Sequence, residues 1–287
     1  MKLTLKSYEF DLKLRPLVMG ILNVTPDSFW DGGKYRAPQD ALLRAHKLHE
    51  EGADIIDVGG ESTRPGSSGV GVDEELERVG PVVEKILKEI PVPVSIDTRK
   101  AAVARQMLSL GAHLVNDVSG LTYDPEMVNV IREFDVPVVI MHMRGTPLNM
   151  QEFTQYADVV EDVKSELLDR ISIARRTGLR QDQIIIDPGI GFSKTAEQCV
   201  EIIARLDQFT QLGYPVLIGP SRKSFIGKTL YLDPELRLEP TITCCLWAAL
   251  NGANIVRVHD VGSVVRALRM LEELKAHAKP SKAGTLE

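Results

Sequence analysis

Cysteine is scarce in this sequence, and the spacing of the few present argues against a thiolate metal site. Only three cysteines occur among the 287 residues, and none of them forms a Cys-x-x-Cys pair. Cys244 and Cys245 are adjacent and cannot easily bond to each other, while Cys199 is distant in sequence. We therefore expect no thiolate zinc site and a protein that resides in a reducing compartment.

Long apolar runs and an excess of positive charge are also missing. No run approaches the roughly 20 apolar residues of a membrane span. The formal net charge of -6 argues against nucleic acid or an anionic membrane as a partner. Residues 1–14 alternate polar and apolar side chains and lack the apolar block of a secretory signal, so we expect a cytoplasmic protein. No Ser-His-Asp order or activated cysteine is evident, which disfavours covalent catalysis.

A regular alternation of apolar and amphipathic segments fills the chain. Eight short apolar segments are predicted to be strands, and a segment with helical character follows each one. The predicted strands are 17–22, 54–60, 93–98, 113–120, 137–143, 184–191, 215–223 and 254–261. The predicted helices are 39–52, 73–89, 99–110, 125–134, 157–177, 196–209, 240–251 and 262–277.

This alternation predicts an α/β protein with a (β/α)8 TIM barrel and an N-terminal β-hairpin. Strands this apolar are buried on both faces, as in a parallel sheet. The alternative is an open doubly wound sheet with extra units, and eight units in a chain near the usual barrel length of roughly 250 residues favour the closed barrel. Residues 3–14 have the period of a hairpin, which we expect to plug the N-terminal end. The expected domain spans 1–277, and we expect 278–287 to be a disordered tail.

Every predicted strand ends in side chains that form hydrogen bonds or carry charge. The active site of such a barrel lies at the C-terminal ends of its strands. Helix capping and loop hydration account for some of these groups, but not for acids, amides and bases that converge from all the strands. The residues are Asn23, Asp57 to Glu61, Asp97, Asn116, His142, Asp187, Ser221 to Lys223, and Arg257 with His259.

One set of these residues is suited to bind a flat heterocycle. Asp97, Asn116 and Asp187 offer acceptors and amide groups, and Lys223 adds a donor. A planar, nitrogen-rich ring such as a pterin presents a matching array of N–H groups and ring acceptors. Buried polar groups facing such a ring reject analogues that leave them unpaired.

A second set of residues is cationic. Arg257 and His259 lie two residues apart on a strand, so they point to the same side. Together with Arg64 and Lys223 they indicate an anionic ligand, and the loops after the seventh and eighth strands of this fold commonly hold phosphate. The alternative for Arg257 is a salt bridge to Asp57 or Asp260.

Asn23 is a candidate ligand for Mg²⁺. This ion keeps several waters and takes one or two protein oxygens in addition to phosphate oxygens, so one amide beside a diphosphate would suffice. The alternative is an asparagine that bridges loop backbone. Trp247 and Leu250 belong to an apolar helix face and are expected in the core.

Eight stretches at the strand ends are specific enough to compare with known families. They are GILNVTPDSFWDGG, DIIDVGGESTRPG, SIDT, NDVSG, MHMRGTP, DPGIGFSK, GPSRKSFIG and IVRVHDV. They resemble the dihydropteroate synthase family, in the family's order and across residues 17–261. This resemblance implies a (β/α)8 barrel, usually a homodimer, with Mg²⁺ as cofactor. It also implies that 4-aminobenzoate is joined to (7,8-dihydropterin-6-yl)methyl diphosphate in folate biosynthesis, with sulfonamides as competitors.

The resemblance also implies roles for individual residues. Loops 25–36 and 62–72 would close over the site, and Trp30 stands where the family commonly has Ser, which bears on aminobenzoate affinity. The catalytic residues would be Asp97, Arg257 and His259, and Asn23 would contact Mg²⁺. Asp97, Asn116, Asp187 and Lys223 would bind the pterin, while Thr63, Arg257 and His259 would bind the diphosphate. Phe29, Arg64, Pro65, Phe192 and Ser221 would form the aminobenzoate pocket.

Two other functions compete with this one. A methyltetrahydrofolate–corrinoid methyltransferase is a related pterin-binding barrel, but the Ser221–Lys223 run and the Arg257/His259 pair favour a diphosphate substrate. A catalytically silent pterin-binding paralogue that serves as a partner subunit is the second alternative. The presence of both residue sets disfavours it.

Overall fold

Eight parallel strands form the central sheet of the protein. The computed structural model describes residues 1–25 and 37–278. The sheet has the order β8-β7-β6-β5-β4-β3-β10-β9, and an isolated parallel bridge between Ile186 and Val216 joins its two ends. The predicted closed barrel is thus confirmed. Its strands are β3 (Leu17–Asn23), β4 (Ile55–Gly59), β5 (Val94–Asp97), β6 (Leu114–Asp117), β7 (Val138–Met141), β8 (Ile184–Asp187), β9 (Leu217–Ile218) and β10 (Ile255–Val258).

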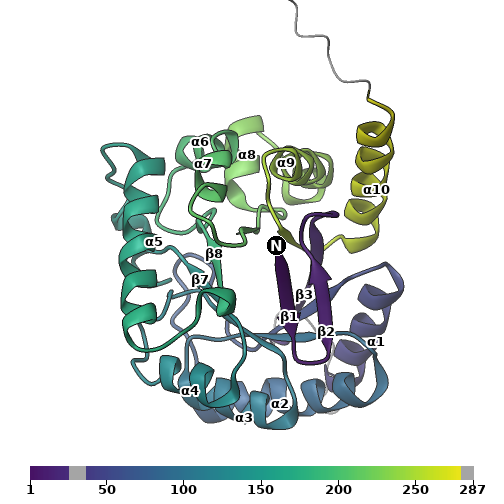
Figure 1. Ribbon diagram of the computed structural model, residues 1–287, viewed down its shortest axis with the longest axis vertical. Helices are drawn as coiled ribbons and strands as arrows, with labels where there is room; N and C mark the ends of the chain where they lie inside the picture. The colour runs from purple at the N-terminus through teal and green to yellow at the C-terminus, as the bar shows by residue number, and fades with distance from the viewer. Residues whose placement is uncertain (26–36, 279–287) are drawn as a thin grey trace, which may run out of the picture.

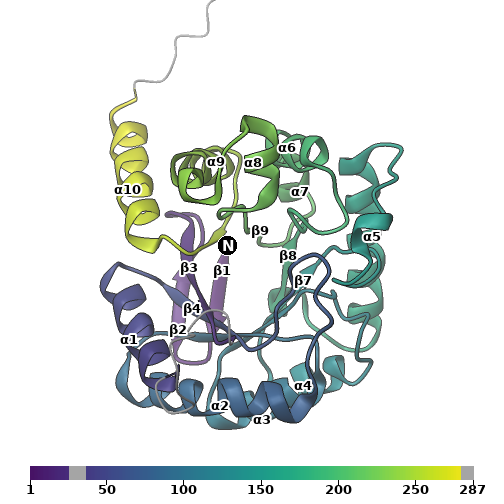
Figure 2. The same ribbon diagram turned by 180° about the vertical axis from the view of Figure 1, so that it is seen from behind.

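Helices surround this barrel on its outside (Figure 1), and the view from behind shows the same ring (Figure 2). The helix predicted at 196–209 is divided into two, and the loop after β9 holds a complete helix, α8. No helix within residues 1–25 and 37–278 is long and apolar enough to cross a membrane. The helices are α1 (Ala37–Glu50), α2 (Val72–Glu89), α3 (Ala101–Leu110), α4 (Met127–Phe134), α5 (Val159–Arg176), α6 (Ala196–Ala204), α7 (Asp207–Thr210), α8 (Ser224–Leu230), α9 (Leu238–Leu250) and α10 (Val261–His277).

The seventh barrel strand is much shorter than the sequence predicts. Only Leu217–Ile218 pairs as β9, whereas the apolar pattern predicts an extended segment over 215–223. Pro215 and Pro220 flank this strand and lack the N–H group that a sheet ladder needs. Arg222 then adopts a left-handed backbone with φ of 53°. The chain therefore turns out of the sheet early and carries Ser221 and Lys223 in a loop.

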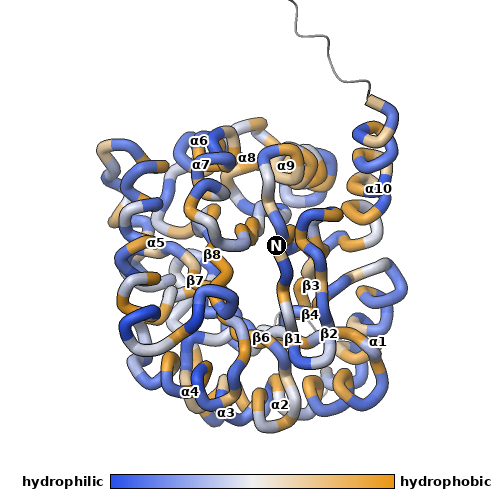
Figure 3. Tube along the Cα trace, in the orientation of Figure 1, coloured by the Kyte–Doolittle hydropathy of each residue, from blue (hydrophilic) through white to orange (hydrophobic). Residues whose placement is uncertain are grey.

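The inward faces of the strands change from apolar to polar along the barrel. Because side chains two residues apart share one side of a strand, an apolar side chain near the N-terminal end is followed by a polar one nearer the C-terminal end. Figure 3 shows the apolar character of β7 and β8 in the barrel wall. This pattern places the polar groups at one end of the barrel. The pairs are Ile55 and Asp57 on β4, Leu114 and Asn116 on β6, Ile185 and Asp187 on β8, and Ile255 and Arg257 on β10.

An N-terminal hairpin closes the opposite end of the barrel, as predicted. Strands β1 (Lys2–Leu5) and β2 (Tyr8–Asp11) pair antiparallel and lie across the barrel in Figure 1. Leu3 and Leu5 are buried in one cluster with Ile55, Leu114 and other apolar residues from the lower barrel wall. The hairpin therefore completes the core below the polar site.

Replacing Leu5 with alanine is expected to destabilise the fold by about 2–5 kcal/mol, because a large side chain leaves a packed cavity behind. Leu5 is fully buried in the hairpin cluster. The control is Leu14→Ala, because Leu14 is 79% exposed. Its expected effect is within about 0.5 kcal/mol. Urea unfolding measures both, and equal midpoints for the two variants would contradict the role of the plug.

Candidate active site

Four strands contribute to a buried cluster of charged and polar side chains at the C-terminal end of the barrel. Arg257 on β10 donates from Nε to Asp57 on β4 and from Nη2 to Asp97 on β5, each across 2.6 Å. Asn116 on β6 donates from Nδ2 to the same Asp57 oxygen across 3.0 Å. Of the two salt bridges considered for Arg257, the one to Asp57 is present, whereas Asp260 pairs with another arginine.

Burial and mutual attraction set the charges of this cluster. Burial raises the pKa of Asp97 to about 7, and the adjacent Arg257 opposes that rise. Burial by itself lowers the pKa of Arg257, but attraction to Asp57 and Asp97 raises it overall. The guanidinium therefore stays charged. A ligand that takes the Asp97 oxygen to which Nη2 donates competes with Arg257 for that oxygen.

A second group of site residues lies at the end of β8 and around the loop that follows it. Asp187 is buried and accepts a hydrogen bond from Gly189 N across 2.7 Å. Burial raises the pKa of Asp187, while the nearby Lys223 lowers it. Lys223 donates from Nζ to Ile190 O across 2.6 Å and lies 4.7 Å from the ring centre of Phe192. Burial lowers the pKa of Lys223 to about 8, so most of it still carries charge at neutral pH.

His259 and Ser221 form a hydrogen-bonded pair beside β10. The Ser221 hydroxyl accepts from the His259 backbone N–H across 3.1 Å and lies 2.9 Å from His259 Nδ1. Burial, and then the charge of Arg257, lower the pKa of His259 to about 4. The imidazole is therefore neutral at neutral pH, which corrects the prediction that it is a cation. With the hydroxyl donating to Nδ1, the ring proton resides on Nε2.

The loop after β4 is tied to the rest of the molecule at both ends. Glu61 receives hydrogen bonds from Arg99 and Lys100, and its Oε1 accepts from Val70 N across 3.3 Å. The tip is joined to the loop after β7 through Gly66 N and Pro147 O, 2.9 Å apart. These bonds hold the segment that carries the candidate residues Thr63, Arg64 and Pro65. Thr63 is half-buried, whereas Arg64 and Pro65 are exposed to solvent.

Asn23 lies half-buried at the C-terminal end of β3, where its backbone pairs with Gly59. Among the residues that the structure describes, no group of three or more His, Cys, Asp or Glu side chains is placed to hold a metal ion. A single amide oxygen fits Mg²⁺ only if the ion takes its other ligands from substrate phosphate and water. The donor set is therefore compatible with a metal that arrives with a diphosphate.

Comparisons with known proteins agree with this geometry. A family model described as pterin binding enzyme matches residues 19–259. Dihydropteroate synthase of Synechocystis sp. is 46% identical over 266 residues, which cover 92% of each chain. Dihydropteroate synthase of Bacillus subtilis is 48% identical over 263 residues, which cover 91% of this chain and 90% of that one. The chain belongs to the dihydropteroate synthase family. The transferase class and the place in folate biosynthesis predicted from the sequence are thereby confirmed.

Solved structures of dihydropteroate synthases have the same fold. The Clostridium difficile enzyme, determined in the presence of pteroic acid, has a TM-score of 0.87 at 46% identity and covers 94% of this chain and 100% of that one. The Xanthomonas albilineans enzyme in complex with 7,8-dihydropteroate has a TM-score of 0.88 at 39% identity and covers 97% of this chain and 100% of that one. These relatives favour the synthase over the corrinoid methyltransferase.

The predicted site residues of this dihydropteroate synthase family member fall into groups that differ in placement. Direct contacts join Asp97 to Arg257, Ser221 to His259, and Lys223 to Phe192. Asn116 joins the first group through Asp57, and Asp187 interacts electrostatically with Lys223. Thr63, Arg64, Pro65 and Asn23 lie on the loop after β4 and at the end of β3, and no hydrogen bond or ion pair among the described residues joins their side chains to these groups. Phe29, Trp30 and nearly all of the first loop lie outside the described residues.

His142 lies at a strand end but belongs to a different network. It is fully buried, and its Nε2 lies 3.0 Å from Glu166 on α5. Its Nδ1 lies 2.9 Å from Lys194 Nζ, which also donates to Phe192 O across 3.0 Å. Burial lowers the pKa of Lys194 to about 7 and that of His142 to about 3. The network supports the turn between Asp187 and Phe192, and nothing in the sequence indicates that these distant residues meet.

Proposed function

We propose that this protein joins (7,8-dihydropterin-6-yl)methyl diphosphate to 4-aminobenzoate, giving 7,8-dihydropteroate and diphosphate, at the C-terminal mouth of the barrel. The observation that carries the proposal is that Arg257 bonds to the ring-binding Asp97 and, through Asp57, is linked to the amide of Asn116. The residues that would bind the ring therefore lie next to the residue that would bind the anion. A substrate made of a ring and a diphosphate requires this arrangement. Related structures contain 4-aminobenzoic acid or 7,8-dihydropteroate, which supports these substrates.

The ring would be held between the two buried carboxylates. Asp97 and Asp187 accept N–H groups from opposite parts of the pterin, and Asn116 supplies a further polar contact. Lys223, whose Nζ now donates to a carbonyl, would turn to a ring acceptor. A carboxylate in an apolar surrounding forms strong hydrogen bonds with N–H donors, and an analogue that lacks the donors leaves it unpaired.

The diphosphate would be held by the groups on β10. When the ring takes over Asp97, the Nη2 atom of Arg257 loses its present partner and becomes available to a phosphate oxygen. His259 would donate from Nε2 as a neutral group, with Ser221 fixing that tautomer. Thr63 would add a hydroxyl donor from the loop after β4. Mg²⁺, bound to Asn23 and the substrate's own oxygens, would neutralise the charge of the leaving group.

The chemistry needs no nucleophile from the protein. The bond between the methylene carbon and the diphosphate oxygen breaks, and its electron pair leaves with the diphosphate. Arg257 and His259 stabilise that departing charge. Asp97 faces the positive charge that spreads into the pterin ring and stabilises it. The amine of 4-aminobenzoate forms the new C–N bond and releases a proton, and the surrounding loops limit competing hydrolysis by excluding water.

The aminobenzoate would bind next to the Lys223–Phe192 pair. Ser221 lies in the same loop as Lys223, and Arg64 and Pro65 would contribute from the loop after β4, while Phe29 lies outside the described residues. A dihydropteroate synthase of Yersinia pestis has been determined with a sulfonamide drug complex, with a TM-score of 0.90 at 40% identity. We propose that sulfonamides compete for the same pocket here.

A condensation assay tests the proposed function. Purified protein is mixed with the dihydropterin methyl diphosphate, labelled 4-aminobenzoate and Mg²⁺, and dihydropteroate is detected by chromatography. Product that disappears when Mg²⁺ is chelated supports the proposal. Tight pterin binding without product would instead favour the methyltransferase or the silent paralogue, and the absence of pterin binding would refute the ring-binding assignment.

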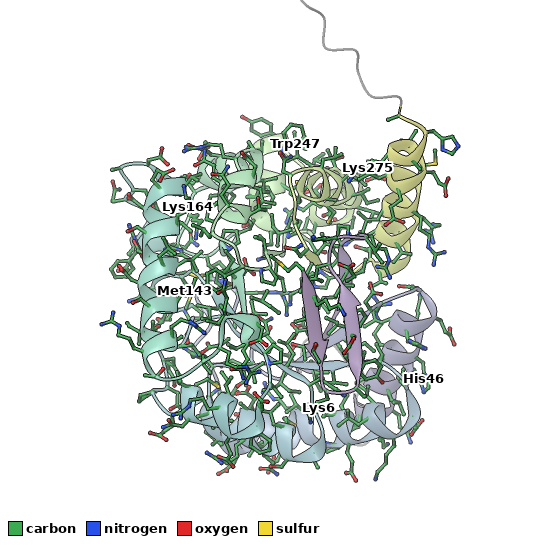
Figure 4. The ribbon with its side chains drawn as sticks, in the orientation of Figure 1. Lys6, His46, Met143, Lys164, Trp247 and Lys275 are labelled. Atoms are coloured by element: carbon green, nitrogen blue, oxygen red, sulfur yellow. The ribbon has the colours of Figure 1, made fainter. Side chains whose placement is uncertain are left out.

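We also propose that the protein is a homodimer that pairs through its last helices. The sequence predicts Trp247 and Leu250 in the core, but they are 49% and 54% exposed on α9, which corrects that prediction. Figure 4 shows Trp247 at the periphery of the molecule, away from the barrel. Leu230 and Tyr231 at the end of the preceding helix α8 are exposed as well. An apolar surface of this kind is typical of an interface.

Replacing Trp247 with glutamate is expected to convert the dimer into a monomer, because it places a charge among apolar side chains that would be desolvated on pairing. Sedimentation velocity measures the change. Leu168→Glu is the control, since Leu168 is a comparably exposed leucine on α5, outside this surface. A dimer that persists in the Trp247 variant would contradict the proposed interface.

A further inference from the structure

Asp57 joins the two halves of the proposed site, although no role has been assigned to it so far. It lies on β4 with its side chain fully buried. Its Oδ2 accepts from Asn116 Nδ2 across 3.0 Å and from Arg257 Nε across 2.6 Å. These partners come from β6 and β10, so one carboxylate oxygen connects the group that would bind the ring to the group that would bind the diphosphate.

This contact determines which way the Asn116 amide faces. An ionised carboxylate only accepts hydrogen bonds, so the amide must turn its NH2 group toward Asp57. Arg257 Nε donates to the same oxygen across 2.6 Å, so this oxygen accepts from two donors at once. The carbonyl oxygen of Asn116 is then left as an acceptor for an N–H group of the ligand. Asp57 thus selects one of the two donor–acceptor patterns that this asparagine can present.

The same carboxylate holds one side of Arg257 in place. Nε is bound to Asp57 and Nη2 to Asp97, so the guanidinium is fixed at two points. A ring that occupies Asp97 releases Nη2 but leaves the Nε contact intact. Arg257 can then turn toward the diphosphate without losing its position, because Asp57 acts as the pivot. Binding of the ring and capture of the diphosphate become linked through one side chain.

The surroundings of Asp57 suggest more than a structural ion pair. Its second oxygen, Oδ1, is buried without a hydrogen-bond partner among the described residues, and so is the hydroxyl of Ser95. Ser95 lies directly beside Asp57 in the register of β4 and β5. A buried carboxylate oxygen without a partner is costly and is expected mainly where a functional constraint holds it.

We infer that Asp57 is a positioning residue of the pterin site, which orients the amide of Asn116 and anchors Arg257 without touching the substrate. The inference rests on the proposed function. It explains why Asn116 would present its carbonyl oxygen, and not its NH2 group, to the ring. It also explains why one buried carboxylate serves two partners from separate strands.

The direct test is Asp57→Asn, which preserves shape and removes the charge. The new amide can donate as well as accept, so Asn116 is no longer forced into one orientation. Calorimetry would compare two ligands, 6-hydroxymethyl-7,8-dihydropterin and its diphosphate. We expect the affinity for the alcohol to fall about 10-fold, because only the orientation of Asn116 is lost for this ligand. We expect the affinity for the diphosphate to fall about 100-fold, because the anchoring of Arg257 is lost as well. Ser95→Ala, at the neighbouring inward position, should leave both affinities unchanged.

A double variant separates positioning from general damage to the fold. If Asp57 acts on the ring through Asn116, the Asp57→Asn, Asn116→Ala protein binds the alcohol as well as Asn116→Ala alone does. If the fold-loss in affinity of the double variant equals the product of the losses of the two single variants, the inference is overturned. Unchanged affinity of Asp57→Asn for both ligands would also overturn it. If the wild-type protein binds neither ligand, the proposed function fails and the inference fails with it.

The Asn116→Asp variant tests the same contact while leaving Asp57 intact. When the new carboxyl group is protonated, it donates to Asp57 and keeps its carbonyl oxygen for the ring, whereas the ionised form repels Asp57. Affinity of the variant for the alcohol should therefore fall as pH rises, by about 10-fold more than the affinity of the wild type does. The wild type is the control, because Asp97 and Arg257 surround residue 116 in both proteins. A variant whose affinity follows the wild-type pH profile would contradict the inference.

Discussion

Replacing Arg257 with glutamine is expected to reduce kcat/KM for the diphosphate substrate by about 10³-fold, because a charged donor aimed at the leaving group is lost. The side chain also neutralises two buried carboxylates, Asp57 and Asp97. Without it neither acid has its cationic partner, and the repulsion between them favours protonation of Asp97, which then donates where the ring requires an acceptor. Both effects act in the same direction.

Steady-state kinetics and calorimetry with the diphosphate substrate measure this loss. Arg105→Gln is the control, since Arg105 lies on α3 and pairs with Glu133 away from the cluster. Arg257→Lys keeps the charge but not the forked geometry, so we expect it to recover only part of the affinity. Unchanged affinity of Arg257→Gln for the diphosphate substrate would refute the assignment.

The sequence predicts the barrel because each strand repeats one local pattern. Ile55 two residues before Asp57, or Ile185 two residues before Asp187, indicates a strand whose inward face is apolar below and polar above. Local pattern also places the hairpin, since Leu3 and Leu5 alternate with polar residues. Features of this kind require only short stretches of chain, and they are confirmed.

Pairing between distant residues is predicted only in part. The sequence offers Asp57 and Asp260 as alternative partners of Arg257, and the register of the closed barrel brings Asp57, 200 residues away, to it. His142 has the same strand-end pattern as Asn116, yet it contacts Glu166 and Lys194 in place of the cluster. The neutral state of His259 follows from burial and from the charge of Arg257, which the sequence does not reveal.

Replacing Asp187 with asparagine is expected to weaken pterin binding by about 100-fold or more, because a buried acceptor for ring N–H groups becomes a group that also presents donors. Asp187 is buried near Lys223 and attracts its ammonium group more strongly than Asp97 does. Removing the charge therefore also lowers the pKa of Lys223 further and weakens its hydrogen bond to the ring. The two losses reinforce each other.

Titration of the pterin alcohol by calorimetry measures the effect without the diphosphate, so the result reports on the ring alone. Asp182→Asn is the control, because Asp182 precedes the same strand but forms an exposed ion pair with Arg180. The Asp187 variant retains an oxygen for the Gly189 N–H, so the turn after β8 should remain folded and Phe192 should stay in place. An unaffected dissociation constant would contradict the assignment of Asp187 to the pterin ring.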